Sequence, residues 1–142
     1  PKMSVYGWTP SCKGGGPDDL SGTEMIHLVP YKGKLYGGTG YWKNFGSWRP
    51  AEVVRLDCNT CDWVVETQIS PYAGRTEVLK EITWTTTATG EKLAEPVTKL
   101  LAGFYLNWEG EGRCKYTARD DEAKVWHSAV YWKKKPFKSN YF

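Results

Sequence analysis

The stretch that decides the fold runs from His27 to Gly38 and reads HLVPYKGKLYGG. It holds two short runs of aliphatic, β-branched and aromatic residues, with Pro30 and Gly33 between them, a pattern typical of β-strands. Similar runs follow as far as residue 67, each separated from the next by Gly, Pro, Asn or Asp. We therefore predict four successive strands: Met25–Val29, Lys34–Gly38, Ala51–Leu56 and Trp63–Thr67.

The second half of the chain shows the same pattern of short apolar runs separated by turn residues. A short helix over Leu93–Leu101 is the alternative there, but Pro96 and the β-branched Val97 and Thr98 favour a strand. The fold class expected is all-β, with antiparallel four-stranded units and little helix. The four further strands predicted are Thr76–Thr85, Val97–Leu106, Arg113–Arg119 and Val125–Trp132.

Internal repetition links the two halves. The sequence KLYGG at residues 34–38 recurs as KLLAG at residues 99–103, and an aspartate stands six residues before both Trp63 and Trp126. This order indicates two copies of one module, neither of which closes a core alone. The domains expected are an irregular N-terminal arm (1–24), a first blade-like repeat (25–72), a second (73–132) and a basic, aromatic C-terminal tail (133–142).

The repeat resembles a known family. Residues 27–38 are similar to the first two strands of a kelch-type β-propeller blade, with the pair Gly37 and Gly38 closing the second strand. Residues 54–63 resemble the third and fourth strands, ending on Trp63. The resemblance implies that the glycines approach the central channel and that the tryptophan packs between neighbouring sheets.

Two blades are fewer than the roughly four to eight that close a propeller ring. The resemblance thus leaves three arrangements open: self-association with further copies, further blades in a longer protein, or a two-sheet sandwich. A second register is also visible, because residues 127–132 are similar to a first strand and would begin a third blade.

Composition limits the classes of protein. The 142 residues carry 21 aromatic side chains, and the longest apolar run, at 100–106, is far shorter than the roughly 20 residues of a membrane helix. There are 19 basic and 16 acidic side chains, and four of the lysines lie in the acid-free last ten residues. We therefore expect a folded domain with no membrane span and no nucleic-acid partner.

Four cysteines are present, at positions 12, 58, 61 and 114. An even number in a small domain fits an oxidising compartment and a secreted or extracellular protein. The spacing of Cys58 and Cys61 fits a turn disulfide, and free thiols, a metal site or redox chemistry are the alternatives. All four residues are disulfide candidates: Cys12, Cys58, Cys61 and Cys114.

The candidate binding site lies in two aromatic loops. Residues 39–50 hold four rings, an amide and two cations, and residues 104–111 occupy the equivalent place in the second repeat. Aromatic rings offer flat faces to the C–H faces of sugars, while amide, guanidinium and carboxylate groups bind hydroxyls. The predicted ligand-binding residues are Tyr41, Trp42, Asn44, Trp48, Arg49, Asn107, Trp108 and Glu109.

The function expected from these features is non-catalytic, lectin-like binding of carbohydrate, with no cofactor and no metal. Neither a catalytic triad nor a calcium or phosphate loop is apparent, since the two histidines, His27 and His127, are isolated and the acid cluster at 120–122 fits a turn. Two alternatives remain: a structural or assembly protein of an extracellular filament or complex, whose rings form subunit contacts, and a fragment of a propeller enzyme acting on polysaccharide.

Overall fold

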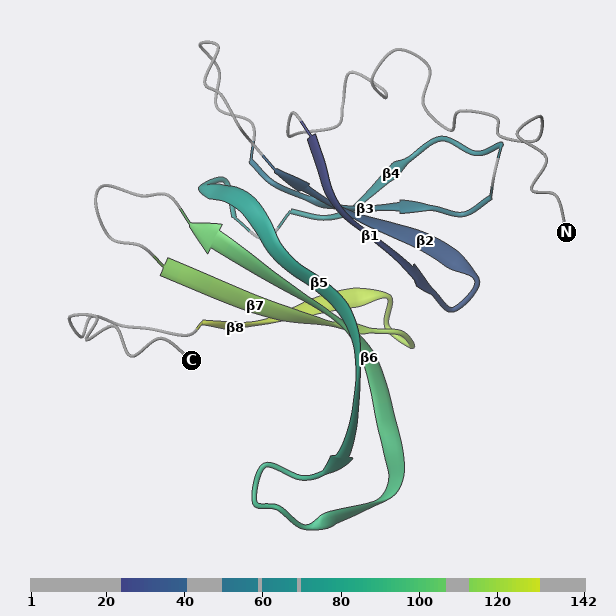
Figure 1. The fold of residues 1–142 in the computed structure, drawn as a ribbon, viewed down its shortest axis with the longest axis vertical. Coiled ribbons are helices and arrows are strands. Elements are labelled where there is room, and N and C mark those ends of the chain that lie inside the picture. The colour runs from purple at the N-terminus through teal and green to yellow at the C-terminus, as the bar shows by residue number, and fades with distance from the viewer. Residues whose placement is uncertain (1–23, 41–49, 59, 69, 107–112, 131–142) are drawn as a thin grey trace, which may run out of the picture.

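The computed structural model describes residues 24–40, 50–58, 60–68, 70–106 and 113–130. Within these ranges the chain forms eight strands and no helix (Figure 1). All strand pairs are antiparallel, so the prediction of an all-β, antiparallel fold is confirmed. The strands are β1 (Glu24–Tyr31), β2 (Lys34–Gly40), β3 (Val53–Leu56), β4 (Val64–Thr67), β5 (Ala73–Thr86), β6 (Lys92–Leu106), β7 (Arg113–Asp120) and β8 (Val125–Val130).

Each predicted strand overlaps one of these eight. The stretch where a helix was the alternative lies in β6, which continues through Pro96 as a strand. The turn between β1 and β2 consists of Lys32 and Gly33, whose φ angles of 47° and 74° are both positive, as in a type I′ hairpin. A search of the described residues finds no helix able to cross a membrane.

The strands form two meanders that belong to one sheet. β1 to β4 pair in sequence order, and so do β5 to β8. In the described residues the meanders are joined by one pair, Gly40 of β2 opposite Arg75 of β5. The amide N–H of Ala51 also donates to the carbonyl of Ala73, 2.6 Å away. The sheet turns back on itself until it is nearly closed into a barrel.

One core fills the interior between the two meanders. The largest side chains buried in it are Tyr31 of β1, Tyr36 of β2 and Phe104 of β6, all almost completely removed from solvent. Val29, Leu106 and Trp126 pack against its margin. Each meander therefore covers the inner face of the other. The buried members are Tyr31, Tyr36, Ala51, Val53, Ala73, Leu79, Leu100, Ala102 and Phe104.

The kelch-like propeller resemblance is wrong. In a propeller each four-stranded blade is a separate sheet that packs against its neighbours around a channel. Here the two meanders share one sheet and one core, and no propeller blade is present in the described part of the chain. Because each meander covers the inner face of the other, no further blade is needed to cover it, and self-association stays a prediction without that support.

Gly37 and Gly38 make room for side chains of neighbouring strands. The kelch resemblance implied instead that they approach a central channel. A Cβ on Gly38 would lie 2.7 Å from Cγ2 of Thr76, a completely buried residue of β5. A Cβ on Gly37 would clash with the sulfur of Met25. Gly38 thus lets the second meander approach the first, and no propeller channel is involved.

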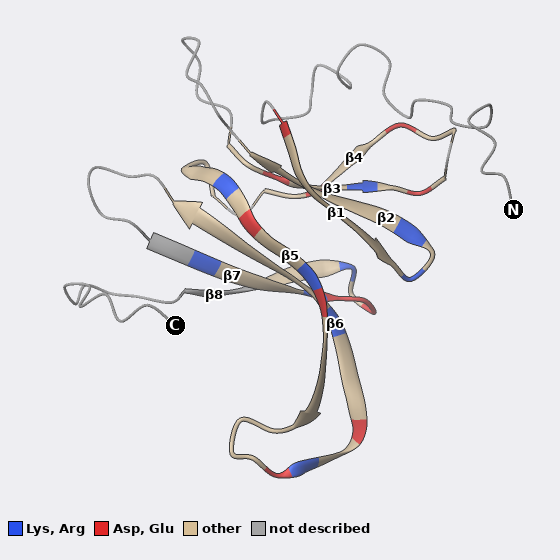
Figure 2. Ribbon diagram, in the orientation of Figure 1, with Lys and Arg blue, Asp and Glu red and all other residues tan. Residues whose placement is uncertain are grey.

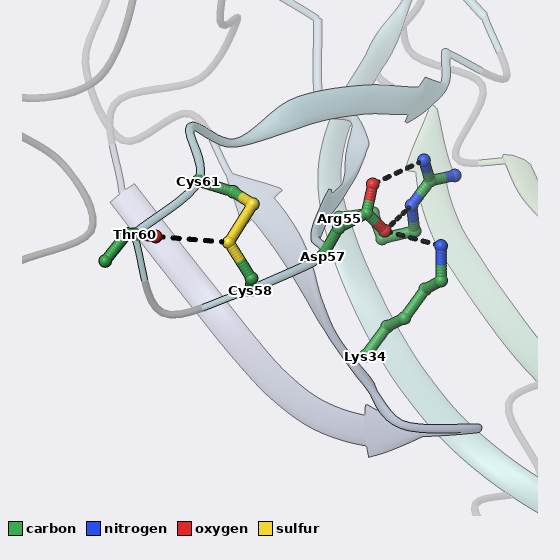
Figure 3. Close-up of a disulfide and its surroundings, with 6 residues drawn as sticks. All are labelled: Lys34, Arg55, Asp57, Cys58, Thr60 and Cys61. Carbon is green, nitrogen blue, oxygen red and sulfur yellow. Dashed lines mark hydrogen bonds and ion pairs between the residues drawn. A yellow bond between two sulfur atoms is a disulfide. The ribbon is translucent and has the colours of Figure 1, made fainter.

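Cys58 and Cys61 form a disulfide across the connection between β3 and β4, as predicted (Figure 3). Their Cα atoms are 5.1 Å apart, within the usual range. A bonded pair has no free thiol and no thiolate for a metal, so these two alternatives are wrong for Cys58 and Cys61, while redox chemistry stays a prediction. Trp63 follows it and is buried with Val54 and Leu56 in a second, smaller cluster. Cys12 lies outside the described residues, as does the side chain of Cys114.

Loss of this disulfide is expected to have a moderate effect on stability. The bridge closes a short loop, with a sequence separation of 3. For so short a loop the chain-entropy model predicts a stabilisation of about 2 kcal/mol. A Cys58→Ala, Cys61→Ala double variant should therefore unfold at a lower urea concentration, with the free energy of unfolding reduced by that amount. An unchanged urea midpoint would contradict the expected contribution.

The hairpin of β5 and β6 extends beyond the barrel (Figure 1). Leu79 and Leu100 are its last core residues. Farther out, Trp84 and Val97 face each other across the two strands with 38% and 41% of their surfaces exposed. We call residues 82–99 the projecting arm. It is held by strand pairing rather than by a core.

Candidate functional site

The two predicted aromatic loops leave the barrel at the same end. β2 and β6 both run antiparallel to β5, so they run parallel to each other. Gly40, the last residue of β2, pairs with Arg75, and Arg75 pairs with Tyr105, one residue before the end of β6. Since neighbouring strands lie roughly 4.8 Å apart, the points at which the two loops begin are separated by about 10 Å.

The chain enters and leaves the described part at that end as well. β1 begins with Glu24 opposite Gly40, and β8 ends at Val130, opposite Lys115 near the start of β7. Residues 1–23, 41–49, 107–112 and 131–142 therefore all connect to one end of the barrel (Figure 1). Twelve of the 21 aromatic side chains occur in these four ranges. We call this the aromatic end.

The predicted ligand-binding residues themselves lie outside the described residues. This holds for the five in the first loop and the three in the second. The described strands bring together the starting points of the two loops, although these loops are more than 60 residues apart in the sequence. The residues concerned are Tyr41, Trp42, Asn44, Trp48, Arg49, Asn107, Trp108 and Glu109.

Three outward-facing side chains near the aromatic end were not predicted. Arg75 and Tyr105 are direct partners across β5 and β6, so they lie on the same face of the sheet. Tyr116 of β7 lies on that face too, opposite Gly103. Because Phe104 is buried, its neighbour Tyr105 must point outward. That alternation was available in the sequence, but the pairing of Arg75 with Tyr105 was not.

The opposite end, where β1 turns into β2 and β7 into β8, contains a chain of ion pairs. Figure 2 shows lysines in blue at the first of these turns, and acidic residues in red beside one blue lysine at the second. Glu66 of β4 joins two arginines: its Oε1 accepts from Nε of Arg119 at 2.6 Å, and its Oε2 accepts from Arg55. We call the set the charge ladder. In order of contact its members are Lys32, Asp121, Arg119, Glu66, Arg55, Asp57 and Lys34.

The charge ladder ends at two lysines, each of which forms an ion pair with an aspartate: Lys34 with Asp57, and Lys32 with Asp121. Asp57 accepts two hydrogen bonds from Arg55, at 2.7 and 3.0 Å, and one from Lys34 at 2.6 Å (Figure 3). Asp121 accepts from the hydroxyl of Tyr31 at 2.6 Å and from Arg119 at 2.7 Å. Each carboxylate of the ladder thus has a cationic partner, and this pairing indicates a structural role.

The ladder changes the pKa values of its members. Burial raises the pKa of Tyr31 well above its ordinary value of 10, and the hydrogen bond to Asp121 adds to this. Burial also opposes ionisation of Asp121, but hydrogen bonds from Lys32, Tyr31 and Arg119 outweigh it and lower the pKa. The hydrogen bonds from Arg55 and then Lys34 hold the pKa of Asp57 far below its ordinary value.

These shifts predict that acid destabilises the protein through the ladder. A lowered carboxyl pKa contributes stability above the ordinary value of 3.8, and that stability is lost as the pH falls below it. In an Asp57→Asn, Asp121→Asn double variant, the free energy of unfolding should change less between pH 5 and pH 2 than in the wild type, roughly the range over which such groups protonate. Urea unfolding across this range measures the effect. If the free energy of unfolding changes equally with pH in both proteins, other carboxylates cause most of the acid destabilisation.

No metal centre is evident in the described part of the chain, since it contains no group of three or more His, Cys, Asp or Glu side chains suited to hold an ion. The described side chains near the aromatic end include one guanidinium and two tyrosine rings, those of Arg75, Tyr105 and Tyr116. Comparison with protein-family models, with curated proteins and with solved structures found no match to this chain.

Proposed function

We propose that this protein is a non-catalytic carbohydrate-binding module whose ligand site lies at the aromatic end. The observation that carries the proposal is the pairing of Gly40 with Arg75 and of Arg75 with Tyr105. Through it, the loops containing Trp42 and Trp108 start only one strand apart. Two ring-bearing loops that begin so close together would supply the mixed apolar and polar surface that sugars bind.

The disulfide supports the accompanying proposal that the protein is secreted or extracellular. Cys58 and Cys61 are bonded, and structural disulfides persist in oxidising compartments. Extracellular glycans would then be accessible to the aromatic end. Several weak sugar contacts on neighbouring loops would add avidity for a polymer.

Binding of glycans to the wild type and to three tryptophan variants tests this function. We expect Trp42→Ala and Trp108→Ala each to weaken binding by about tenfold or more, since each removes a stacking ring. Trp84→Ala is the matched control, because it removes an exposed tryptophan from the projecting arm on the far side of the barrel. A glycan array followed by calorimetry on the best ligand gives the measurement.

Two outcomes would contradict the carbohydrate function. In one, the wild type retains no sugar on the array. In the other, all three variants bind as the wild type does, so that the loop rings have no part in recognition. Either result would favour packing of those rings within the protein or against another subunit.

The second candidate is a structural or assembly protein, and the projecting arm favours it. Trp84 and Val97 expose apolar surface on a hairpin that has no core of its own. Solution mass measured over a range of concentrations addresses this candidate. A monomer at all concentrations would exclude self-assembly, whereas an oligomer dissociated by Trp84→Ala would support it.

A further inference from the structure

Three neighbouring strands form an outer surface next to the aromatic end. Arg75 of β5 and Tyr105 of β6 are direct partners, and Gly103 and Tyr116 are partners one step farther along β6 and β7. Side chains of direct and diagonal partners lie on one face of a sheet, within reach of one another. Arg75, Tyr105 and Tyr116 therefore line one patch, which we call the outer platform.

Gly103 explains how the ring of Tyr116 lies in this platform. A Cβ on Gly103 would be 2.9 Å from Cε1 and 3.0 Å from Cδ1 of that ring. The ring thus lies against the backbone of Gly103, which is buried beneath it, while 39% of Tyr116 stays exposed. Tyr105 beside it is 41% exposed. The platform consequently offers two tyrosine rings held on a rigid sheet.

Arg75 places a cation beside these rings. Its side chain is 44% exposed, and Cγ would lie 3.4 Å from a Cβ on Gly40, so the stem covers the last residue of β2. The acid paired with it among the described residues is Glu77, at 3.8 Å between Nε and Oε1. That distance is too long for a hydrogen bond. The guanidinium fork can therefore donate to an incoming anion.

We propose that the outer platform is a subsite for an acidic sugar, a hexuronate residue of a glycan. The C–H face of the pyranose would lie on Tyr105 or Tyr116, and the carboxylate would accept two hydrogen bonds from Arg75. This inference rests on the carbohydrate-binding function proposed above and names its ligand class. A single-stranded nucleic acid also combines rings with anions, but the near balance of 19 basic and 16 acidic side chains disfavours it.

The platform is continuous with the predicted loops. Arg75 pairs with Gly40, directly before the loop of residues 41–49, and Tyr105 lies two residues before the loop of residues 107–112. The platform thus lies beside the two points at which these loops begin. A glycan that binds at the aromatic end would have Arg75 next to it.

Calorimetry with matched acidic and neutral ligands tests the subsite. The probes are tetragalacturonate and a hyaluronan oligosaccharide, each beside its methyl ester, which keeps the rings and removes the charge. We expect wild type to bind at least one acid about tenfold more tightly than its ester, and added salt to reduce the difference. Arg75→Gln should abolish this preference, so that acid and ester bind with equal affinity. Lys92→Gln, which removes the same charge from the projecting arm, should keep it.

Several results would overturn the inference. Equal binding of acids and esters by wild type, or a preference that survives in Arg75→Gln, excludes a carboxylate subsite at Arg75. If neutral glycans then still bind in a manner that depends on Trp42, the proposed function stands and the acidic ligand class alone fails. If no glycan binds, both proposals fail. Tighter binding of oligothymidylate than of either acid would assign the platform to nucleic acid instead.

Discussion

Replacing Glu66 with glutamine is expected to destabilise the protein by about 3 kcal/mol, the loss typical of breaking a buried ion pair. Glu66 and Arg119 have side chains only 6% and 8% exposed, and they bond at 2.6 Å. The carboxylate also bonds Arg55, so its loss leaves two guanidinium groups with one partner fewer. The free energy of unfolding in urea gives the measurement.

Two further variants make this test specific. Glu77→Gln is the matched control, since Glu77 is half-exposed and its ion-pair distance is 3.8 Å; we expect a change of less than about 1 kcal/mol. In Arg119→Met, Glu66→Leu the buried pair is replaced by apolar groups, and stability should recover relative to Glu66→Gln. A Glu66→Gln variant as stable as Glu77→Gln would contradict a structural role for the charge ladder.

Replacing Phe104 with alanine is expected to remove about 3–5 kcal/mol from the free energy of unfolding. Phe104 is 1% exposed and lies in the core to which both meanders contribute. Its removal leaves a cavity between them, where the sheet joins β2 to β5. We expect the variant to have a lower melting temperature and a less cooperative unfolding transition than the wild type.

Tyr105→Ala is the natural comparison for Phe104→Ala. The two residues are adjacent in β6, but Tyr105 faces outward and is 41% exposed. The alanine variant should therefore lose less than about 1.5 kcal/mol and remain folded, which also qualifies it for binding measurements. Equal losses at the two positions would mean that the inner and outer faces of β6 are assigned the wrong way round.

The strands were predictable because they depend on local order. Alternation and β-branched residues mark β1 to β8, and the positive φ of Lys32 and Gly33 completes the first hairpin. The disulfide was predictable for the same reason, since Cys58 and Cys61 are three positions apart. Predicting these features requires no knowledge of contacts between residues that are distant in the sequence.

The arrangement of the two meanders was not predictable from that pattern. A four-stranded meander has the same strand pattern whether it forms a propeller blade or half of a barrel, and the kelch-like residues Gly37, Gly38 and Trp63 favoured the blade. The barrel depends on the pairing of Gly40 with Arg75 and on the contact of Gly38 with Thr76, which joins residues 38 positions apart. No local propensity encodes such a contact.

The same holds for the two ends of the barrel. Sequence reasoning identified the aromatic loops, but it missed Arg75 and the outer platform, since a lone arginine in a strand carries no signal. It also missed the charge ladder, in which Arg119 contacts Glu66 across 53 positions and Tyr31 contacts Asp121 across 90.

The amino-acid sequence by itself determined the strands, their antiparallel order within each meander, the hairpin turn and the Cys58–Cys61 bridge. These follow from side-chain alternation, backbone conformation and short loops, all of which act between near neighbours. Tertiary structure alone decided that the meanders share one core, that ion pairs gather at one end and that the four ranges whose sequences hold twelve aromatic residues attach at the other. The physical reason is that burial and ion pairing act between whatever groups the closed sheet brings together, whatever their distance in the chain.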